Sequence, residues 1–143
     1  MHAAKLILRK DAKLENFETL HDNVYWAGAA PRLSIAIPTY RYDCSDLIDA
    51  LSRCKSSALA EIIVYDDGAK DHALLAKMEQ SAGAVRAAVR IVSAWQNRGR
   101  AAARNAAVAH ARSNWVLLLD ADMSPESPDF VEAYLDAADR LDL

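Results

Sequence analysis

From residue 33 onward, short apolar runs alternate with segments in which apolar side chains recur every three or four residues. The apolar runs predict four strands, over 33–37, 61–68, 89–95 and 115–119. The other segments predict four helices, over 43–55, 71–80, 98–112 and 127–141. The first strand is expected to end at Pro38, because proline lacks the N–H group that would continue a hydrogen-bonded ladder.

Residues 1–32 follow a different pattern. Leu14, Phe17 and Leu20 have loose helical spacing, which predicts a helix within 5–23, and a turn-rich stretch follows. We therefore expect residues 1–32 to be an N-terminal extension that packs on a main domain of residues 33–143. The extension carries no motif from which a function could be deduced.

Strands that alternate with helices predict a Rossmann-like, three-layer α/β/α fold with a mainly parallel sheet. In such folds ligands bind at the carboxyl ends of the strands. All four predicted strands are followed there by polar sequences, namely PTY, DDG, QNRG and DAD. We therefore predict a ligand-binding cleft at this edge of the sheet.

The composition limits the class of protein. With 143 residues, 52% of them apolar and 26% charged, the chain suits one soluble domain with a real core. No apolar run is long enough for a membrane span, and no convincing signal peptide is present. Cys44 and Cys54 lie too far apart along one predicted helix to pair, which favours reduced thiols and a cytoplasmic setting.

The net charge of −3 hides an asymmetry along the chain. From Gln80 to Leu119 there is no acidic residue but there are six arginines, and acidic residues crowd just outside this segment. The pattern suits a phosphate-bearing ligand held together with a metal ion, with a solvated arginine face as the alternative. The acidic total and the lack of a basic–aromatic pattern argue against nucleic acid as a partner.

Asp120 and Asp122 follow the fourth predicted strand directly. Two carboxylates so close together repel each other, and a divalent cation would compensate them. Mg²⁺ and Mn²⁺ prefer carboxylate and phosphate oxygens, and they often use one or two carboxylates plus substrate phosphates. The alternative is that the two residues cap a helix near Ser124 and Pro125, but their place after an apolar strand that we expect to be buried favours the metal.

Two further groups are candidates for ligand contacts. Asp66 and Asp67 end the second strand, where one carboxylate could accept the N–H of a nucleobase imide, and a solvated turn is the alternative. Arg98 and Arg100 begin a predicted helix, where the helix dipole disfavours positive charge, so a bound anion would explain them. Arg104 lies one turn after Arg100 on the same face and is the stronger candidate, since Arg98 also suits a solvated surface.

Other residue types carry less information. The four histidines have no ligand spacing to each other or to a cysteine, and Walker loops, nucleophile elbows and G-x-G-x-x-G after a strand do not occur. Tyr40 and Trp95 end their strands and could stack on a base, although packing in the core is the default for both.

Taken in order and spacing, SIAIPTYRYD, EIIVYDDGAKD and NRGRAAARNAAVAHARSNWVLLLDADM resemble the nucleotide-sugar-binding half of inverting GT-A glycosyltransferases of family 2, over about 33–131. The resemblance implies a nucleotide-diphospho-sugar donor, with a UDP-sugar as the first candidate, and Mn²⁺ or Mg²⁺ as cofactor. By the same resemblance, the nucleoside pocket would be lined by Pro38, Thr39 and Tyr40. Asp67 would bind the base, and Arg104 would lie near the nucleotide. Asp120 and Asp122 would form the D-x-D motif, with Asp122 as the more direct metal ligand. The family often has Asn at the position of Arg41 and Ser at that of Ala69, which bears on the identity of the donor.

The resemblance also implies an acceptor-binding half that supplies the catalytic base, and no residue of this chain is assigned to that role. We therefore expect a truncated chain, with a natural stand-alone binding module as the alternative. The implied acceptor is a saccharide or a lipid-linked molecule, as in polysaccharide biosynthesis, and the full-length protein could associate with a membrane. The sheet edge left open suggests a homodimer.

Three rival functions share some of these sequence features. VLLLDADMS also resembles the first motif of haloacid-dehalogenase-type phosphatases, but no lysine follows it in the remaining residues. A nucleotidyltransferase of similar fold would need a glycine-rich loop after the first strand, where this chain has PTYRYD. A non-catalytic nucleotide or nucleotide-sugar binding module stays open, and ligand binding without transfer or hydrolysis would identify it.

Overall fold

The computed structural model describes residues 3–7 and 17–141, with side chains from residue 17 onward. Its elements in chain order are β1 (Ala3–Ile7), β2 (Glu18–Asp22), β3 (Leu33–Thr39), α1 (Ser45–Ser52), the 3₁₀ helix η2 (Ser57–Leu59), β4 (Ala60–Asp66), α2 (His72–Ala84), β5 (Ala88–Ala94), α3 (Arg100–Ala109), β6 (Val116–Leu118) and α4 (Phe130–Leu141). The strands form one six-stranded sheet in the order β1-β2-β5-β4-β3-β6.

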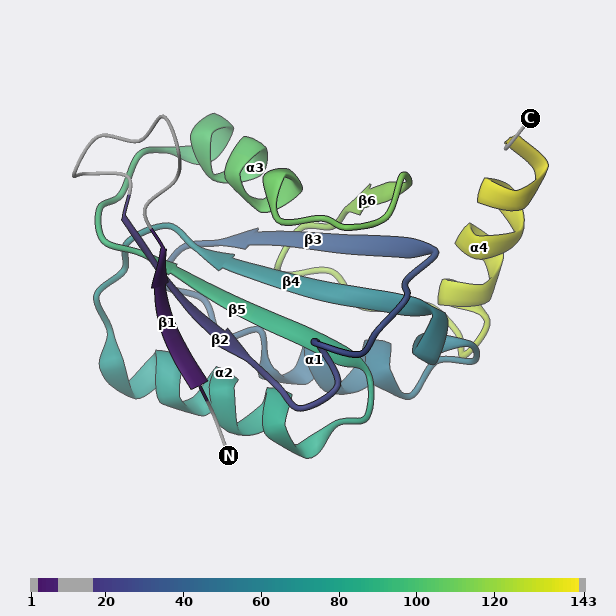
Figure 1. Cartoon of the computed structure of the whole chain (residues 1–143), viewed down its shortest axis with the longest axis horizontal. Coiled ribbons are helices and arrows are strands. Elements are labelled where there is room, and N and C mark those ends of the chain that lie inside the picture. The colour runs from purple at the N-terminus through teal and green to yellow at the C-terminus, as the bar shows by residue number, and fades with distance from the viewer. Residues whose placement is uncertain (1–2, 8–16, 142–143) are drawn as a thin grey trace.

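The sheet is parallel where the sequence predicted it to be. β3 pairs in parallel with both β4 and β6, and β4 pairs in parallel with β5. Helices α1 and α2 cover one face and α3 covers the other (Figure 1). The larger core cluster includes Ile48 of α1 and Met78 of α2, and the smaller one includes Ala103 and Ala107 of α3. The predicted three-layer α/β/α architecture is therefore confirmed.

The secondary structure of the N-terminal segment was predicted wrongly. β1 and β2, which replace the predicted helix, pair antiparallel with each other, and β2 pairs antiparallel with β5 (Figure 1). Leu20 is buried opposite Val92, and Phe17 precedes the strand, while Leu14 lies outside the described residues. The partner that makes β2 a strand is the free edge of β5, about seventy residues further along the chain, so local spacing could not reveal it.

The first predicted strand does not end at Pro38, because β3 continues to Thr39. Ser34 N–H donates to the Trp115 carbonyl and Leu119 N–H donates to the Ala36 carbonyl, so alternate residues of β3 face the β6 side. The backbone nitrogen of Pro38 points to that same side, two residues beyond Ala36, where the pairing with β6 ends. The missing N–H of Pro38 therefore falls beyond the end of the β3–β6 ladder, while the pairing of β3 with β4 continues to Thr39.

Both cysteines flank α1 and do not lie in one helix as predicted, because α1 is shorter than the predicted 43–55. Cys44 precedes the helix and Cys54 follows it, and both are buried free thiols. Burial raises the pKa of the Cys44 thiol from 9.0 to about 11. The thiol is therefore protonated and unreactive at neutral pH.

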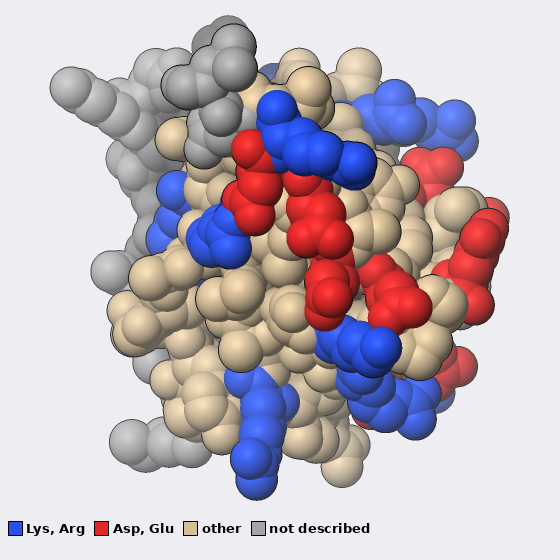
Figure 2. Space-filling view, turned by 90° about the vertical axis from the view of Figure 1, so that its right-hand side faces the viewer, with Lys and Arg blue, Asp and Glu red and all other residues tan. Residues whose placement is uncertain are grey.

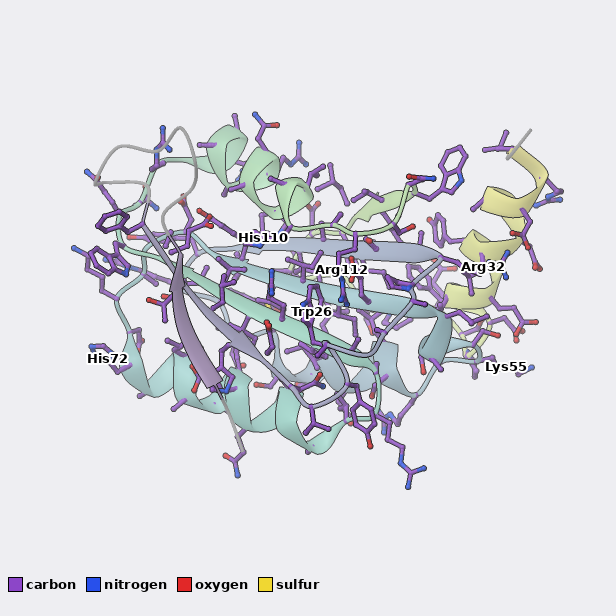
Figure 3. All side chains as sticks on the ribbon, in the orientation of Figure 1. Trp26, Arg32, Lys55, His72, His110 and Arg112 are labelled. Atoms are coloured by element: carbon purple, nitrogen blue, oxygen red, sulfur yellow. The ribbon has the colours of Figure 1, made fainter. Side chains whose placement is uncertain are left out.

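A partly buried polar network joins residues 17–32 to the α3 face of the sheet (Figure 3). The Trp26 ring lies under two guanidinium groups, with the Cζ atom of Arg112 at 3.9 Å and that of Arg90 at 4.5 Å from its centroid. Arg90 is held by both carboxylate oxygens of Asp22, at 2.7 and 2.9 Å. Arg112 donates to the fully buried Glu61 through its Nε and its backbone N–H, both at 2.7 Å.

Helix α4 lies at one end of the molecule, where it packs through Val131 and Leu135 against the larger core cluster (Figure 1). Acidic and basic side chains stand side by side on this face (Figure 2), and Lys55 pairs with Asp129 at 2.9 Å. Such exposed ion pairs contribute little, so the apolar contacts hold the helix. Within the part of the chain that the structure describes, no helix has the length and apolar character needed to cross a membrane.

Candidate active site

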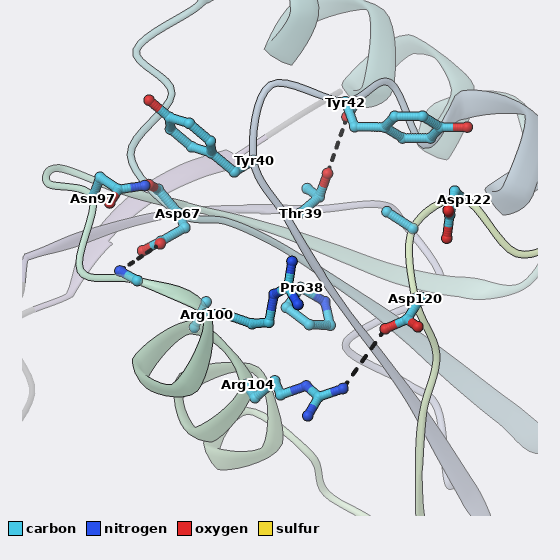
Figure 4. A pocket seen from close by; sticks show the side chains of 13 residues that line it. Pro38, Thr39, Tyr40, Tyr42, Asp67, Asn97, Arg100, Arg104, Asp120 and Asp122 are labelled. Carbon is cyan, nitrogen blue, oxygen red and sulfur yellow. Dashed lines mark hydrogen bonds and ion pairs between the residues drawn. The ribbon is translucent and has the colours of Figure 1, made fainter.

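A cleft of about 590 Å³ opens where β3, β4, β5 and β6 end (Figure 4). Parallel strands bring their carboxyl ends to one edge of the sheet, so the four polar sequences that follow them meet there. The cleft is lined by Pro38, Thr39, Tyr40, Tyr42, Asp67, Asn97, Gly99, Arg100, Ala103, Arg104, Asp120, Ala121 and Asp122. All seven residues predicted for the site are among them.

Asp67 reaches the cleft and also holds the loop that forms its wall. One carboxylate oxygen accepts the backbone N–H of Arg98 at 3.1 Å, and the other accepts that of Gly99 at 2.9 Å. The Asn97 side chain donates to the Asp67 carbonyl at 3.0 Å. A carboxylate has about four acceptor positions, so Asp67 can still accept an N–H group from a ligand. Its orientation is fixed before any ligand arrives.

The turn after Asp67 requires glycine at position 68. Gly68 has a φ of +75°, a conformation that side chains with a Cβ rarely adopt. A Cβ there would lie 2.3 Å from the backbone nitrogen of Asn97 and 2.4 Å from the carbonyl carbon of Gln96. The close approach of these two loops is what places Asn97 on the wall of the cleft.

Asp66 does not line the cleft. It is buried at the end of β4, and its Oδ1 accepts the Ala69 N–H at 3.3 Å. Burial is the main cause that raises the pKa of Asp66 above its ordinary value, and the neighbouring charge of Asp67 adds to it. The two adjacent acids thus have different surroundings: Asp66 closes a turn, and Asp67 faces the cleft.

The loop after β3 forms another wall. The Thr39 hydroxyl donates to the Tyr42 carbonyl at 3.2 Å, which folds the loop back over the strand end. Arg41 has a φ of +55° and places its guanidinium over the Tyr40 ring, 5.0 Å from the ring centroid. Tyr40 remains 44% exposed, so a planar group can still stack on it.

Asp120 and Asp122 lie at the other end of the cleft from Asp67 (Figure 4). Neither caps a helix, because α4 begins only at Phe130. Asp120 forms an ion pair of 3.8 Å with Arg104, which reaches it from the first turns of α3. The preceding strand is less buried than predicted, with Leu118 45% exposed, because β6 is the edge strand of the sheet.

The donor set at this end suits a hard divalent cation. Two carboxylates that face a cleft match the one or two protein ligands that Mg²⁺ or Mn²⁺ commonly takes, with phosphate oxygens and water supplying the others. Among residues 3–7 and 17–141, no three histidine, cysteine, aspartate or glutamate side chains converge. A metal held here would therefore depend on the ligand as much as on the protein.

Some of the residues considered in the sequence lie elsewhere. The Arg98 side chain does not line the cleft. The Trp95 ring packs edge-on against Phe17, with centroids 4.8 Å apart, and its Nε1 donates to the Thr19 hydroxyl at 3.1 Å. Trp95 therefore neither lines the cleft nor packs in the core, because the residue is 44% exposed and its ring rests against Phe17 at the surface.

Sequence reasoning also missed residues of the cleft. Asn97 and Tyr42 were not predicted, and Arg100 was predicted to lie near a bound anion but was not counted among the seven site residues. Asn97 is the second residue after the third predicted strand, and Tyr42 lies two residues after Tyr40 on the same loop. Their place at strand ends was the available signal, but it did not show which side chains turn inward.

The fold defines an α/β protein with a cleft at the carboxyl edge of its parallel sheet, the place where such folds bind ligands. A family model described as "Glycosyl transferase family 2" matches residues 34–143. The chain belongs to this family. A search of curated proteins gave no match.

Solved structures show the same fold. The crystal structure of S. aureus TarS 1–349 has a TM-score of 0.60 and 20% identity, over 76% of this chain and 32% of that one. The mannosyltransferase PcManGT from Pyrobaculum calidifontis, in complex with GDP-Man and Mn²⁺, has a TM-score of 0.62 and 21% identity, over 83% of this chain and 39% of that one. The chain thus spans about a third of the length of each, and the fold is of the GT-A type.

Proposed function

We propose that this chain is the donor-binding part of a glycosyltransferase, which binds a nucleotide-diphospho-sugar together with Mn²⁺ or Mg²⁺ for transfer of the sugar to an acceptor hydroxyl, with inversion. The observation that carries the proposal is the meeting of Asp67 and Tyr40 at one end of a single cleft with Asp120 and Asp122 at the other. Family membership and the complex of PcManGT with GDP-Man and Mn²⁺ support it.

In this proposal the nucleoside lies over Pro38 and Thr39, its base stacks on Tyr40, and its imide N–H donates to Asp67. Asp122 and Asp120 hold the metal, with Asp122 as the direct ligand and Arg104 orienting Asp120 across their 3.8 Å ion pair. The bound metal would act as a Lewis acid that stabilises the leaving nucleotide diphosphate. A UDP-sugar is our first candidate for the donor and a GDP-sugar is the second.

The acceptor in this proposal is a saccharide or a lipid-linked molecule, and its hydroxyl must lose a proton as it attacks. Within the described part of the chain, the carboxylates that line the cleft are Asp67, Asp120 and Asp122, and each already has a role. The base is therefore proposed to come from outside this set, and the chain by itself is expected to bind donor without turning it over. Binding with no transfer at all, even alongside an acceptor-binding part, would favour a non-catalytic binding module.

The test is calorimetric titration with UDP and with GDP, each with and without Mn²⁺. We expect one nucleotide to bind more tightly when Mn²⁺ is present, and Asp122→Ala to remove that gain while the circular dichroism spectrum stays unchanged. Asp136→Ala is the matched control, because it removes an exposed carboxylate of α4 away from the cleft. Equal affinity of Asp122→Ala and the unmodified chain in Mn²⁺ would refute the metal assignment.

We also propose that the free edge of β6, with its exposed Leu118, pairs with a second copy of the chain. Cytoplasmic localisation is part of the same proposal, with any membrane association left to a longer protein. Sedimentation velocity tests the pairing. A dimer that Leu118→Lys converts to a monomer is expected, and a monomer at all accessible concentrations would contradict it.

A further inference from the structure

Arg100 is the cation of the cleft that no other group neutralises. It is the first residue of α3, it lines the cleft, and its side chain is exposed. In the described part of the chain its guanidinium takes part in no hydrogen bond or salt bridge. In the view of Figure 4 the side chain extends toward Pro38, between Asp67 on one side and Asp120 on the other.

The position of this arginine is locally unfavourable. The N-terminus of a helix carries partial positive charge, so a cation there costs stability, typically about 0.3–1 kcal/mol. The first turn of α3 contains no acidic residue that would offset the cost. A residue that breaks a local rule without a compensating contact in the protein suggests a compensating ligand. Because the side chain lies in the cleft, that ligand would bind there.

The second arginine of the cleft does not provide the same contact. Arg104 lies one helical turn away and is paired with Asp120 at 3.8 Å. At this distance the two side chains attract each other without a hydrogen bond, so the charge of Arg104 is directed in part to that carboxylate. Arg100 keeps its whole planar set of donors, which matches two phosphate oxygens at once.

A count of the charges in the proposed complex also indicates a role for Arg100. In the proposed complex, the charges of a divalent cation and of the donor diphosphate cancel. Asp120 and Asp122 then leave two negative charges, of which Arg104 neutralises one. The carboxylate of Asp67, at the other end of the cleft, already accepts hydrogen bonds from two backbone N–H groups. Arg100 supplies the charge that brings the metal end of the site to neutrality.

We propose that Arg100 binds the diphosphate of the nucleotide donor and stabilises it as the leaving group. The inference rests on the proposed function, and it adds a contact that Asp120, Asp122 and Arg104 do not make. The sequence predicted a bound anion near Arg98 and Arg100, and the structure favours Arg100, because Arg98 does not line the cleft.

The test compares uridine, UMP and UDP as ligands, with Mn²⁺ throughout and with the guanosine series in parallel. We expect Arg100→Ala to weaken diphosphate binding by about tenfold, the size of one charge-assisted contact, and to leave nucleoside binding unchanged. Arg100→Lys keeps the charge but loses the planar donors, so its affinity for the diphosphate should lie between that of Arg100→Ala and that of the unmodified chain. Arg86→Ala is the control, because it removes an exposed arginine from the loop before β5, at the opposite edge of the sheet.

The possible results separate the two proposals. If the unmodified chain binds the diphosphate and Arg100→Ala binds it equally well, the role of Arg100 is refuted and the proposed function stands. If Arg100→Ala weakens nucleoside and diphosphate to the same extent, the residue contacts the base, and the diphosphate assignment is again refuted. If the unmodified chain binds neither series, both proposals fail together. Thermal melting of each variant shows that it is folded.

Discussion

Replacing Trp26 tests whether residues 17–32 belong to the folding unit of the domain. The indole is 4% exposed and lies under the guanidinium groups of Arg90 and Arg112. Truncation of a buried tryptophan to alanine usually costs about 3–5 kcal/mol. Partly desolvated cation–π contacts contribute about 1–2 kcal/mol each. We therefore expect Trp26→Ala to lower the free energy of unfolding by about 4 kcal/mol, with the cation–π contacts included in that total.

The assay is urea and thermal unfolding followed by far-ultraviolet circular dichroism, because removing an indole alters the fluorescence signal itself. For a chain of this size a loss of about 4 kcal/mol lowers Tm by roughly 12 °C. Trp26→Phe keeps an aromatic face beneath the arginines and should lose less than half as much. The control is Tyr25→Ala, since the neighbouring side chain is 45% exposed and should change stability by less than about 0.5 kcal/mol. A loss below about 1 kcal/mol for Trp26→Ala would show that the segment is only loosely attached.

Three further predictions concern the turn, the thiol and the buried carboxylate. Gly68→Ala would place a Cβ 2.3 Å from the Asn97 nitrogen, so calorimetry should show weaker nucleotide binding and melting should show a lower Tm; an unchanged variant would mean that this contact does not set the wall of the cleft. Burial raises the pKa of Cys44 from 9.0 to about 11 in the folded state, so its stabilising contribution is complete below pH 9 and is lost as pH rises through 11. Cys44→Ala should therefore show a shallower fall of Tm over that pH range than the unmodified chain. An equal fall would contradict this. Arg112→Ala leaves the fully buried Glu61 without its Nε donor and should cost about 3 kcal/mol, which Glu61→Gln in the same chain should partly restore.

The alternating part of the fold could be predicted because its signals are local. Each strand and helix between residues 33 and 141 carries its own periodic pattern, and parallel topology then brings the strand ends together without further information. Strand β2 could not be predicted in this way. Its partner residues on β5, such as Val92 opposite Leu20, lie far along the chain, and a spacing of apolar residues within 5–23 says nothing about them.

The candidate site was predictable to the same extent. Asp120, Asp122 and Asp67 follow apolar strands, so topology alone places them at one edge of the sheet. The hydrogen bonds that fix Asp67 come from the backbone of residues 98 and 99, in a loop whose path has no periodic signal. The direction of a side chain such as Arg100 depends on the dihedral angles of that loop, and a residue pattern does not encode them.

The position of β6 has a consequence for how this domain communicates with its surroundings. The strand that leads to Asp120 and Asp122 is three residues long and is hydrogen-bonded to β3 on one side only. Any chain that pairs with its other side also fixes the two carboxylates, and a ligand that fixes the carboxylates steadies the strand for pairing. If both proposals hold, donor binding and pairing at this edge are thermodynamically linked, and each strengthens the other by the same factor.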